Sequence, residues 1–209
     1  MTEPHRELQT EGTPYGLLRL LTLPVVAVTC SLGGRANGMI ANGAQRASLV
    51  PTMPRISLYI NKTNLSHDIV YSTGALGLHL LRRDQWELIY NLGFRSGRDV
   101  QKLDGLEVRR GTTGVPLLAD CLAGFDCRVV NAMDAGGATF FLADVVEVLA
   151  GRPGDVMTSD YFRENLPAPR KRMYETLLVE AQERLMRISH AVDYTAWPGP
   201  SASTQRSDS

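Results

Sequence analysis

The stretch "RANGMIANGAQRAS", residues 35–48, decides how the rest of the chain is interpreted. It follows the apolar run "PVVAVTCSL" (24–32), yet it supplies asparagine, glycine, glutamine and arginine among alanines. A strand that begins after the glycine-rich turn at 33–38 would place these residues on one face: Ile40, Asn42, Ala44, Arg46 and Ser48. Small side chains let a flat ligand approach the backbone, and amide and guanidinium groups donate hydrogen bonds to it. An edge or bulged strand with its polar residues in water is the alternative.

The composition predicts one globular domain. With 209 residues, the chain is long enough for one substantial core. An apolar fraction of 44% argues against global disorder. The 22 basic and 22 acidic residues give a formal net charge of zero, which favours neither nucleic acid nor a membrane surface as a partner.

The ends of the chain and its cysteines predict a cytoplasmic protein. Residues 1–14 lack the basic start and apolar stretch of a secretory signal, and no apolar run approaches the roughly 18 residues that span a bilayer. We predict a flexible lead at 1–14, a folded domain at 15–193 and a disordered tail at 194–209, which is poor in apolar residues. Three cysteines form neither an even disulfide set nor a metal-type pair, so we expect three buried thiols at Cys30, Cys121 and Cys127.

Strand signals dominate the predicted domain. Runs rich in β-branched, leucine and aromatic residues occur at 24–32, 55–61, 75–81, 124–133 and 138–149. The last two runs are joined by "DAGG", which predicts an antiparallel hairpin. Mostly antiparallel strands with inserted helices indicate a mainly β barrel and not a βαβ sheet.

Helices are expected as short inserts and one long C-terminal element. The segment "LSHDIVYST" lies between Asn64 as N-cap and Gly74 as left-handed C-cap, and "RDQWELIYNLG" ends on Gly93 in the same way. Pro116 predicts another short helical turn. The segment at 170–188 carries an apolar stripe that needs the barrel or another subunit to cover it: Met173, Leu177, Leu178, Ala181, Leu185 and Met186.

A second polar cluster, "NKTNLSHD" (61–68), follows the predicted strand at 55–61. Backbone N–H groups at a helix start and the charge of Lys62 suit a phosphate. A capped helix with a solvated lysine is the alternative, and His67 alone carries little weight. No nucleophile–base triad, metal-ligand set or nucleotide-binding glycine loop is present in the sequence, so no catalytic or metal residue is predicted.

These motifs, taken in order, resemble the FMN-binding split-barrel flavin reductase family. Residues 24–81 contain a strand, an "NGM" turn, a polar strand, a proline and an "NK" with a following hydroxyl residue. The segments "NLGFRSGRDVQKL" (91–103) and 116–148 resemble the branch with flavoredoxin-like proteins and reductase modules fused to rubredoxin. The resemblance covers about residues 14–165. It implies a split β-barrel with a Greek-key core, short peripheral helices and a C-terminal helix, assembled as a homodimer.

The resemblance also implies which residues bind FMN. The isoalloxazine and ribityl chain would contact Asn37, Gly38, Met39, Ile40, Asn42, Arg46 and Ser48. The phosphate would be held by Asn61, Lys62 and Thr63, with His67 close by, and the segment of Arg95, Ser96 and Gly97 would lie near the flavin edge or the phosphate. NADH or NADPH would be the hydride donor, and the acceptor would be a small molecule, a partner oxygenase or a redox protein.

Two departures from the family pattern leave alternatives open. Many relatives carry a histidine in the hairpin that here contains Gly136, Gly137 and Ala138, and Arg46 stands where an uncharged polar residue is common. Without that histidine, an FMN-holding electron carrier that does not itself oxidise NAD(P)H is the alternative to a reductase. A barrel that has lost its cofactor is a third hypothesis.

Overall fold

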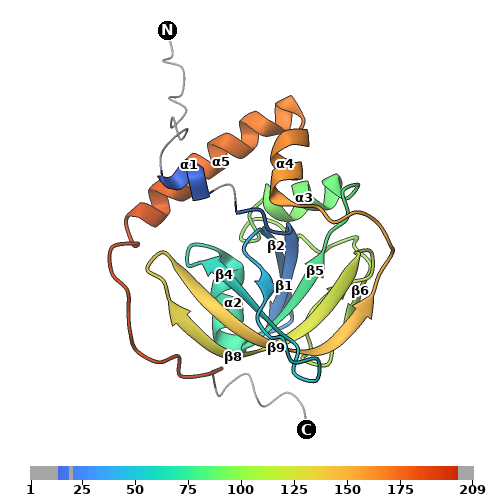
Figure 1. The fold of residues 1–209 in the computed structure, drawn as a ribbon, viewed down its shortest axis with the longest axis vertical. Helices are drawn as coiled ribbons and strands as arrows, with labels where there is room; N and C mark the ends of the chain where they lie inside the picture. The colour runs from blue at the N-terminus through green and yellow to red at the C-terminus, as the bar shows by residue number, and fades with distance from the viewer. Residues whose placement is uncertain (1–13, 19–20, 202–209) are drawn as a thin grey trace.

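A computed structural model describes residues 14–18 and 21–201, so the expected lead at 1–13 and the last part of the tail, 202–209, lie outside the described residues. Its main feature is a seven-stranded antiparallel sheet that curls into a split barrel (Figure 1). The strands run in the order β2-β1-β5-β8-β9-β4-β3. Their bounds are β1 Val26–Leu32, β2 Arg35–Ala41, β3 Gln45–Arg46, β4 Arg55–Asn61, β5 Ala75–Leu80, β8 Ala123–Asp134 and β9 Ala138–Ala150. The mainly β split-barrel prediction is confirmed.

The segment at 35–48 closes the barrel, but not as one strand. Residues 35–41 pair with β1 at one edge of the sheet, whereas Gln45 and Arg46 pair with β4 at the other edge. Because the four steps from Ala41 to Gln45 cover at most about 14 Å of chain, the two edges must lie close together. The prediction of a continuous strand with Ile40 to Ser48 on one face is therefore wrong, and so is the turn over 33–38, since β2 begins at Arg35.

Gly43 explains where the strand breaks. A Cβ atom at this position would lie 2.2 Å from the ring of Tyr59 on β4. The chain therefore passes against an aromatic ring as it leaves one edge for the other, and a larger residue at 43 would have to displace the Tyr59 ring. The polar residues after β2, namely Asn42, Gln45 and Arg46, are exposed along this crossing and do not belong to a regular buried strand.

The strands fill their inner faces with apolar side chains. One cluster of buried residues combines Val28, Leu58, Leu76 and Phe141 from different strands with Val70 of helix α2 (Leu65–Thr73). Gly74 ends α2 with φ 66°, as predicted. The three cysteines are buried and free, which confirms that prediction, and burial raises the pKa of the Cys30 thiol to about 12.

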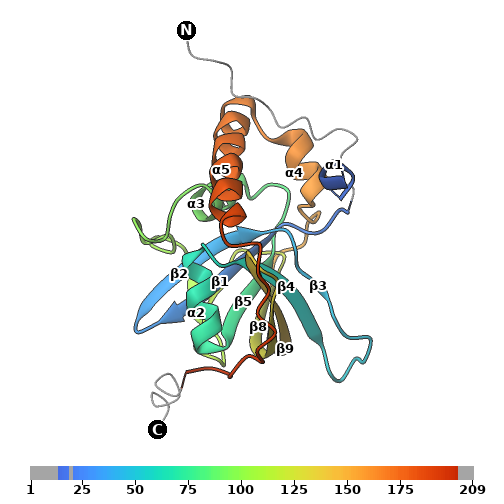
Figure 2. The same cartoon turned by 90° about the vertical axis from the view of Figure 1, so that its left-hand side faces the viewer.

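The remaining helices gather at one end of the barrel, at the top of Figures 1 and 2. They are α1 (Pro14–Leu18), α3 (Trp86–Gly93), α4 (Ser159–Asn165) and α5 (Ala168–Met186). Gly93 is the last residue of α3 and not a left-handed cap, because Phe94 follows with φ −104°. The expected helical turn at Pro116 is wrong, since Pro116–Leu118 form β7, which pairs with β6 (Val108–Arg110).

Residues beyond α5 descend along the barrel toward α2 (Figure 1). Trp197 packs edge-on against Tyr71, at 6.2 Å between ring centroids, and its indole N–H donates to the Tyr71 carbonyl. The expectation that the residues after 193 do not pack against the domain is therefore wrong for Trp197. The domain boundaries as a whole stay a prediction. Within the described part of the chain, no helix has the length and apolar character needed to cross a membrane.

Candidate functional site

A cleft of about 560 Å³ opens between β2, the start of α2, the loop after α3 and helix α5. It brings together residues that are far apart in the sequence. Among the predicted site residues, it is lined by Asn37, Met39, Asn61, Thr63, Arg95, Ser96 and Gly97. Both polar clusters of the sequence therefore open onto one cavity, within the 300–1,000 Å³ range typical of small-molecule sites.

A second, smaller cavity of about 190 Å³ adjoins the cleft, since Gly93 and Phe94 line both. It holds two further predicted residues, Ile40 and Asn42. Its walls are mostly apolar or aromatic: Val25, Ala41, Ile89, Phe94, Phe162 and Tyr174. The pair of cavities offers an elongated site with a polar part and an apolar part.

The polar part has a rigid floor. Asn37 is buried on β2, and its Nδ2 donates to Ser66 Oγ of α2 at 2.9 Å. The loop after α3 lies directly on this floor, because a Cβ atom at Gly97 would be 2.0 Å from Asn37 Oδ1. Arg35 fixes the same loop by donating to the Gly97 carbonyl at 2.5 Å. The sequence therefore needs glycine at 97 for close packing.

The cleft is positively charged. Among the described lining residues, the cations are Arg95, Arg98, Lys102 and Arg184, and the one carboxylate is that of Glu180. Arg95 donates to the Asn91 side chain at 2.9 Å, and Arg98 donates to the Thr63 carbonyl at 3.1 Å. Arg98 also lies 3.9 Å from Asp68 Oδ2 of α2, an exposed ion pair that contributes little. With four cations and one carboxylate along its lining, the cleft favours an anionic ligand.

Lys102 is the most buried of these cations, with 5% of its surface exposed. Its Nζ donates to the Leu92 carbonyl at 2.6 Å, and its own carbonyl accepts from Asn91 at 2.6 Å. Burial lowers the pKa of Lys102 to about 8, because the charged form loses its hydration. An ammonium group has three N–H donors, and the Leu92 carbonyl accepts from one of them. A ligand anion here would accept hydrogen bonds from the others.

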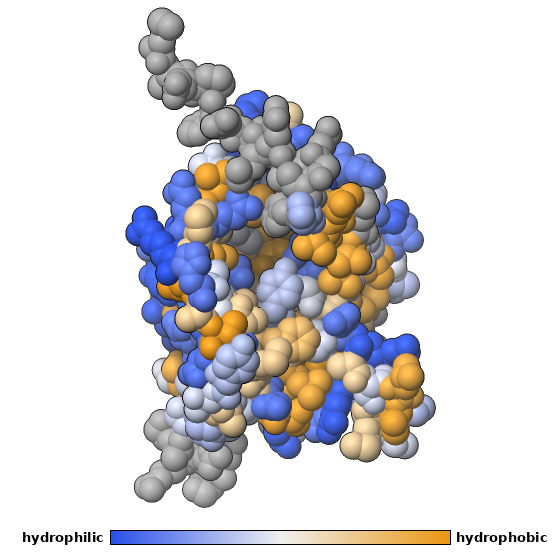
Figure 3. Space-filling view, turned by 60° about the vertical axis from the view of Figure 1, so that its left-hand side comes forward, coloured by the Kyte–Doolittle hydropathy of each residue, from blue (hydrophilic) through white to orange (hydrophobic). Residues whose placement is uncertain are grey.

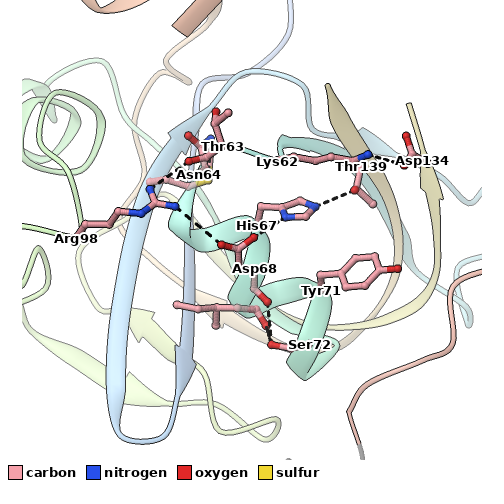
Figure 4. Close-up of polar contacts among 12 residues, drawn as sticks. Lys62, Thr63, Asn64, His67, Asp68, Tyr71, Ser72, Arg98, Asp134 and Thr139 are labelled. Atoms are coloured by element: carbon pink, nitrogen blue, oxygen red, sulfur yellow. Dashed lines mark hydrogen bonds and ion pairs between the residues drawn. The ribbon is translucent and has the colours of Figure 1, made fainter. Parts of the chain in front are cut away.

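Lys62 and His67 do not line either cavity in the described structure, and Figure 4 shows where they point instead. Lys62 Nζ bonds to Asp134 Oδ2 at 2.5 Å, which lowers the pKa of that carboxyl. His67 is buried, with Nε2 2.8 Å from Thr139 Oγ1 and Nδ1 3.0 Å from Asp68. Arg98, in contrast, reaches α2 from the cleft side (Figure 4).

The remaining predicted residues lie around the crossing segment. Gly38 is buried against Leu92 and Leu103, so it supports the floor without lining the cleft. Arg46 is exposed in β3, and Ser48 accepts from the Val50 amide in the following turn. Neither lines the two cavities in the described chain.

Sequence reasoning missed six polar residues of the cleft, which are Asn64, Ser66, Arg98, Lys102, Glu180 and Arg184. Arg98 and Lys102 belong to the same "RSGRDVQK" run as the predicted Arg95, so a cationic cluster was readable there. Asn64 and Ser66 belong to the polar cluster at 61–68, whereas Glu180 and Arg184 carry no comparable local signal. Arg184 becomes a lining residue only because α5 folds back over the barrel.

Comparison with known proteins identifies this architecture. A family model described as "Flavin reductase like domain" matches residues 18–167. The chain belongs to the flavin reductase like domain family. The matched range contains the whole sheet and the loop after α3, but it ends before α5.

Several curated members of this family are similar to the chain. The high molecular weight rubredoxin of Moorella thermoacetica is 31% identical over 70% of this chain, which spans 64% of that protein. The ferric-chelate reductase (NAD(P)H) of Archaeoglobus fulgidus is 34% identical over 64% of this chain and 80% of its own length. The FMN reductase (NADH) SmoA of Agrobacterium fabrum is 30% identical over 66% of this chain and 75% of its own length.

A solved structure shows the same fold. Flavoredoxin from Methanosarcina acetivorans superposes with a TM-score of 0.58 at 21% identity, over 63% of this chain and 70% of that one. At 21% identity, this structural similarity concerns the fold alone.

Proposed function

We propose that this flavin reductase family member is an FMN-dependent oxidoreductase that takes hydride from NADH or NADPH and passes electrons to an acceptor. The family match over 18–167 and the names of the similar reductases support this reaction class. The observation that carries the proposal is the convergence of both polar clusters on one cationic cleft beside an apolar cavity.

The residues present fit FMN. A phosphate dianion would be bound in the cleft by Arg95, Arg98 and Lys102, with Asn61, Thr63 and Ser96 as polar neighbours. The ring system would extend toward Met39, Ile40 and Asn42, where the adjoining cavity offers apolar walls. Gly38 would support β2 behind it.

The other predicted contacts take indirect places in this proposal. Lys62 and His67 would act through the first turn of α2, since Lys62 holds Asp134 and His67 holds Thr139 on the neighbouring hairpin strands. Arg46 and Ser48 would reach the flavin only from the rim of the crossing segment. Variants at these four residues are therefore expected to have smaller effects than variants at Arg98 or Lys102.

The protein's contribution to chemistry would be binding and orientation. The flavin, when bound, supplies the acceptor for hydride and the donor for the next electron transfer. The side chains of the cleft fix the phosphate, and the apolar cavity excludes water around the ring. Consistent with this division, the proposal needs no protein nucleophile or acid–base pair.

Anaerobic stopped-flow mixing tests the reductase directly. Protein loaded with FMN is mixed with NADH or with NADPH, and the flavin absorption band is followed. We expect bleaching faster than that of free FMN with at least one nucleotide. Bleaching no faster than for free FMN with either nucleotide would overturn the reductase.

An FMN-holding electron carrier is the second candidate, and one observation favours it. The hairpin at Gly136 and Gly137 has no space for a side chain, because Cβ atoms there would lie 2.7 Å and 2.4 Å from Ser189 atoms. Neither of these two positions therefore offers a side chain that could contact a nicotinamide. Reduction by a protein donor, without reduction by NAD(P)H, would establish this candidate.

We also propose a cytoplasmic homodimer that serves an oxygenase or a redox partner. Large apolar side chains remain exposed in the single chain, among them Leu49, Val50 and Met53 in the loop after β3 and Met173 and Met186 on α5. Figure 3 shows hydrophobic residues gathered in patches on one face of the molecule. Such patches favour an interface. A monomeric mass at micromolar concentration would refute the dimer.

A further inference from the structure

Helix α5 crosses the opening of the cleft. Four of its residues line the cavity, namely Leu177, Glu180, Ala181 and Arg184. The helix lies outside the family-matched range, which ends at residue 167. None of its residues is fully buried, so α5 covers the cleft without belonging to the barrel core. Figure 2 shows it standing over the end of the barrel beside α3.

The N-terminal half of α5 is anchored by aromatic contacts. Tyr174 packs edge-on against Phe162 of α4, at 5.4 Å between ring centroids, and at a tilt against Phe94, at 6.3 Å. Arg170 lies over the ring of Tyr90 at 4.3 Å. These contacts join α5 to α3 and α4 on the side where the two cavities meet.

The other end of α5 rests on the β8–β9 hairpin. A Cβ atom at Gly137 would lie 2.4 Å from Ser189 Oγ and 3.4 Å from Leu185 Cδ2. The Gly137 carbonyl also accepts from the Lys62 amide at 3.0 Å, next to the predicted phosphate residues. Ser189 Oγ in turn donates to the Leu185 carbonyl at 2.7 Å, which fixes the end of the helix. The hairpin can hold α5 this closely only because position 137 has no side chain.

Arg184 projects from the helix at this covered part of the cleft. Its partner within the helix is Glu180, at 3.8 Å, and both side chains are more than half exposed. Such a pair contributes little, so it competes weakly with a dianionic phosphate for the guanidinium group. The remaining cleft cations come from the barrel side, so Arg184 would close the ring of positive charge from above.

We propose that α5 is the roof of the flavin phosphate site, with Arg184 as a phosphate-binding residue and Gly137 as the residue that positions the roof through Ser189. This inference rests on the proposed function. Its consequence is that FMN stays bound between turnovers as a resident group and leaves slowly. Electrons then reach the acceptor at the protein, without diffusion of reduced flavin.

The release rate of FMN tests the positioning role. Gly137→Val is expected to raise the rate at which FMN dissociates into excess competing apoprotein by about tenfold or more, while Ala135→Val, an exposed change in the same hairpin, leaves it unchanged. Gly137→Ala should raise the rate less, and it should have no further effect in a Ser189→Ala background, because that background lacks the Oγ atom that the new Cβ meets. A Gly137→Ala effect that is equally large in the Ser189→Ala background would overturn the positioning role.

Comparing FMN with riboflavin tests Arg184, because riboflavin has no phosphate. Arg184→Gln should lower the affinity for FMN about tenfold and leave the affinity for riboflavin unchanged. Arg172→Gln, at an exposed position of the same helix, should change neither affinity. Equal affinity of wild type and Arg184→Gln for FMN would overturn the roof contact. A wild-type protein that binds no flavin at all would instead contradict the proposed function, so the two failures are distinguishable.

Discussion

Asn37 of β2 and Ser66 of α2 are joined by a buried hydrogen bond of 2.9 Å at the floor of the cleft. This bond connects the strand at the sheet edge to the helix whose first turn faces the proposed phosphate. Asn37 also touches Gly97 in the loop after α3. One side chain therefore sets the relative position of all three walls on the barrel side.

Replacing Asn37 with alanine should loosen these walls. We expect Asn37→Ala to cost about 1–2 kcal/mol in the free energy of unfolding, because a buried partner loses its bond. FMN affinity should fall as well. Urea unfolding and flavin fluorescence titration measure the two effects. Asn131→Ala, at an exposed position of β8, is the control for FMN binding and should leave the FMN affinity unchanged. Unaltered FMN binding in Asn37→Ala would contradict the role of this floor.

Arg98 should matter more for the phosphate than Lys62 does. Arg98 lines the cleft, whereas Lys62 is bonded to Asp134 outside it. Arg98→Gln is therefore expected to lower the affinity for FMN about tenfold, which corresponds to about 1.4 kcal/mol of binding free energy. Lys62→Gln is expected to lower it less. Titration with FMN and riboflavin separates phosphate binding from ring binding. If Lys62→Gln proves the more damaging variant, the phosphate lies nearer the hairpin than we propose.

Lys102 should make FMN binding depend on pH in the alkaline range. Its pKa is lowered to about 8 by burial, so the charged form that attracts phosphate is present below that pH and is lost above it. The phosphate itself is already dianionic above about pH 7. We expect FMN affinity to fall about tenfold between about pH 7 and about pH 9.5. In Lys102→Met the affinity should be lower than that of the wild type near pH 7, the two should converge near about pH 9.5, and the slope should vanish. A slope that persists in this variant would assign the pH dependence to another group.

His79 should make the fold sensitive to acid. It is fully buried on β5, accepts from the Leu118 amide at 3.0 Å through Nε2, and has a pKa lowered to about 4 by burial. The unfolded chain binds a proton near pH 6.5, so the stability due to neutral His79 is complete above that pH and is lost as pH falls toward 4. The expected loss is up to about 3 kcal/mol, measured by urea unfolding between these pH values. His79→Gln should flatten this dependence, and an equally steep dependence in that variant would exclude His79 as its source.

Much of the fold follows from local sequence signals. The strands at 55–61 and 138–150 and the helix between Asn64 and Gly74 were readable because apolar patterns and caps coincide there. The crossing at 42–44 could not be predicted in this way, because the break between β2 and β3 depends on the ring of Tyr59, a residue of another strand. The prediction of a helical turn at Pro116 was wrong for a similar reason, because pairing with β6 holds this segment as a strand.

The candidate site was predictable only in part. The family resemblance linked three motifs that are far apart in the sequence. One residue from each of them, Asn37, Asn61 and Arg95, lines the cleft. Lys62 looked like the phosphate cation from its place beside a helix start, but a sequence does not show that Asp134, 72 residues later, binds it first. Arg184 could not be found either, because nothing in an exposed helical sequence says which surface the helix covers.

A crystal structure of the protein with bound FMN tests the central claim most directly. The account predicts the phosphate in the cleft, within hydrogen-bond distance of Arg98 and Lys102 and covered by α5, with the ring directed toward Ile40 and Asn42. FMN whose phosphate lies outside this cleft, for example in the cavity lined by Arg110 and Arg128 at the other end of the β1–β2 hairpin, would contradict it.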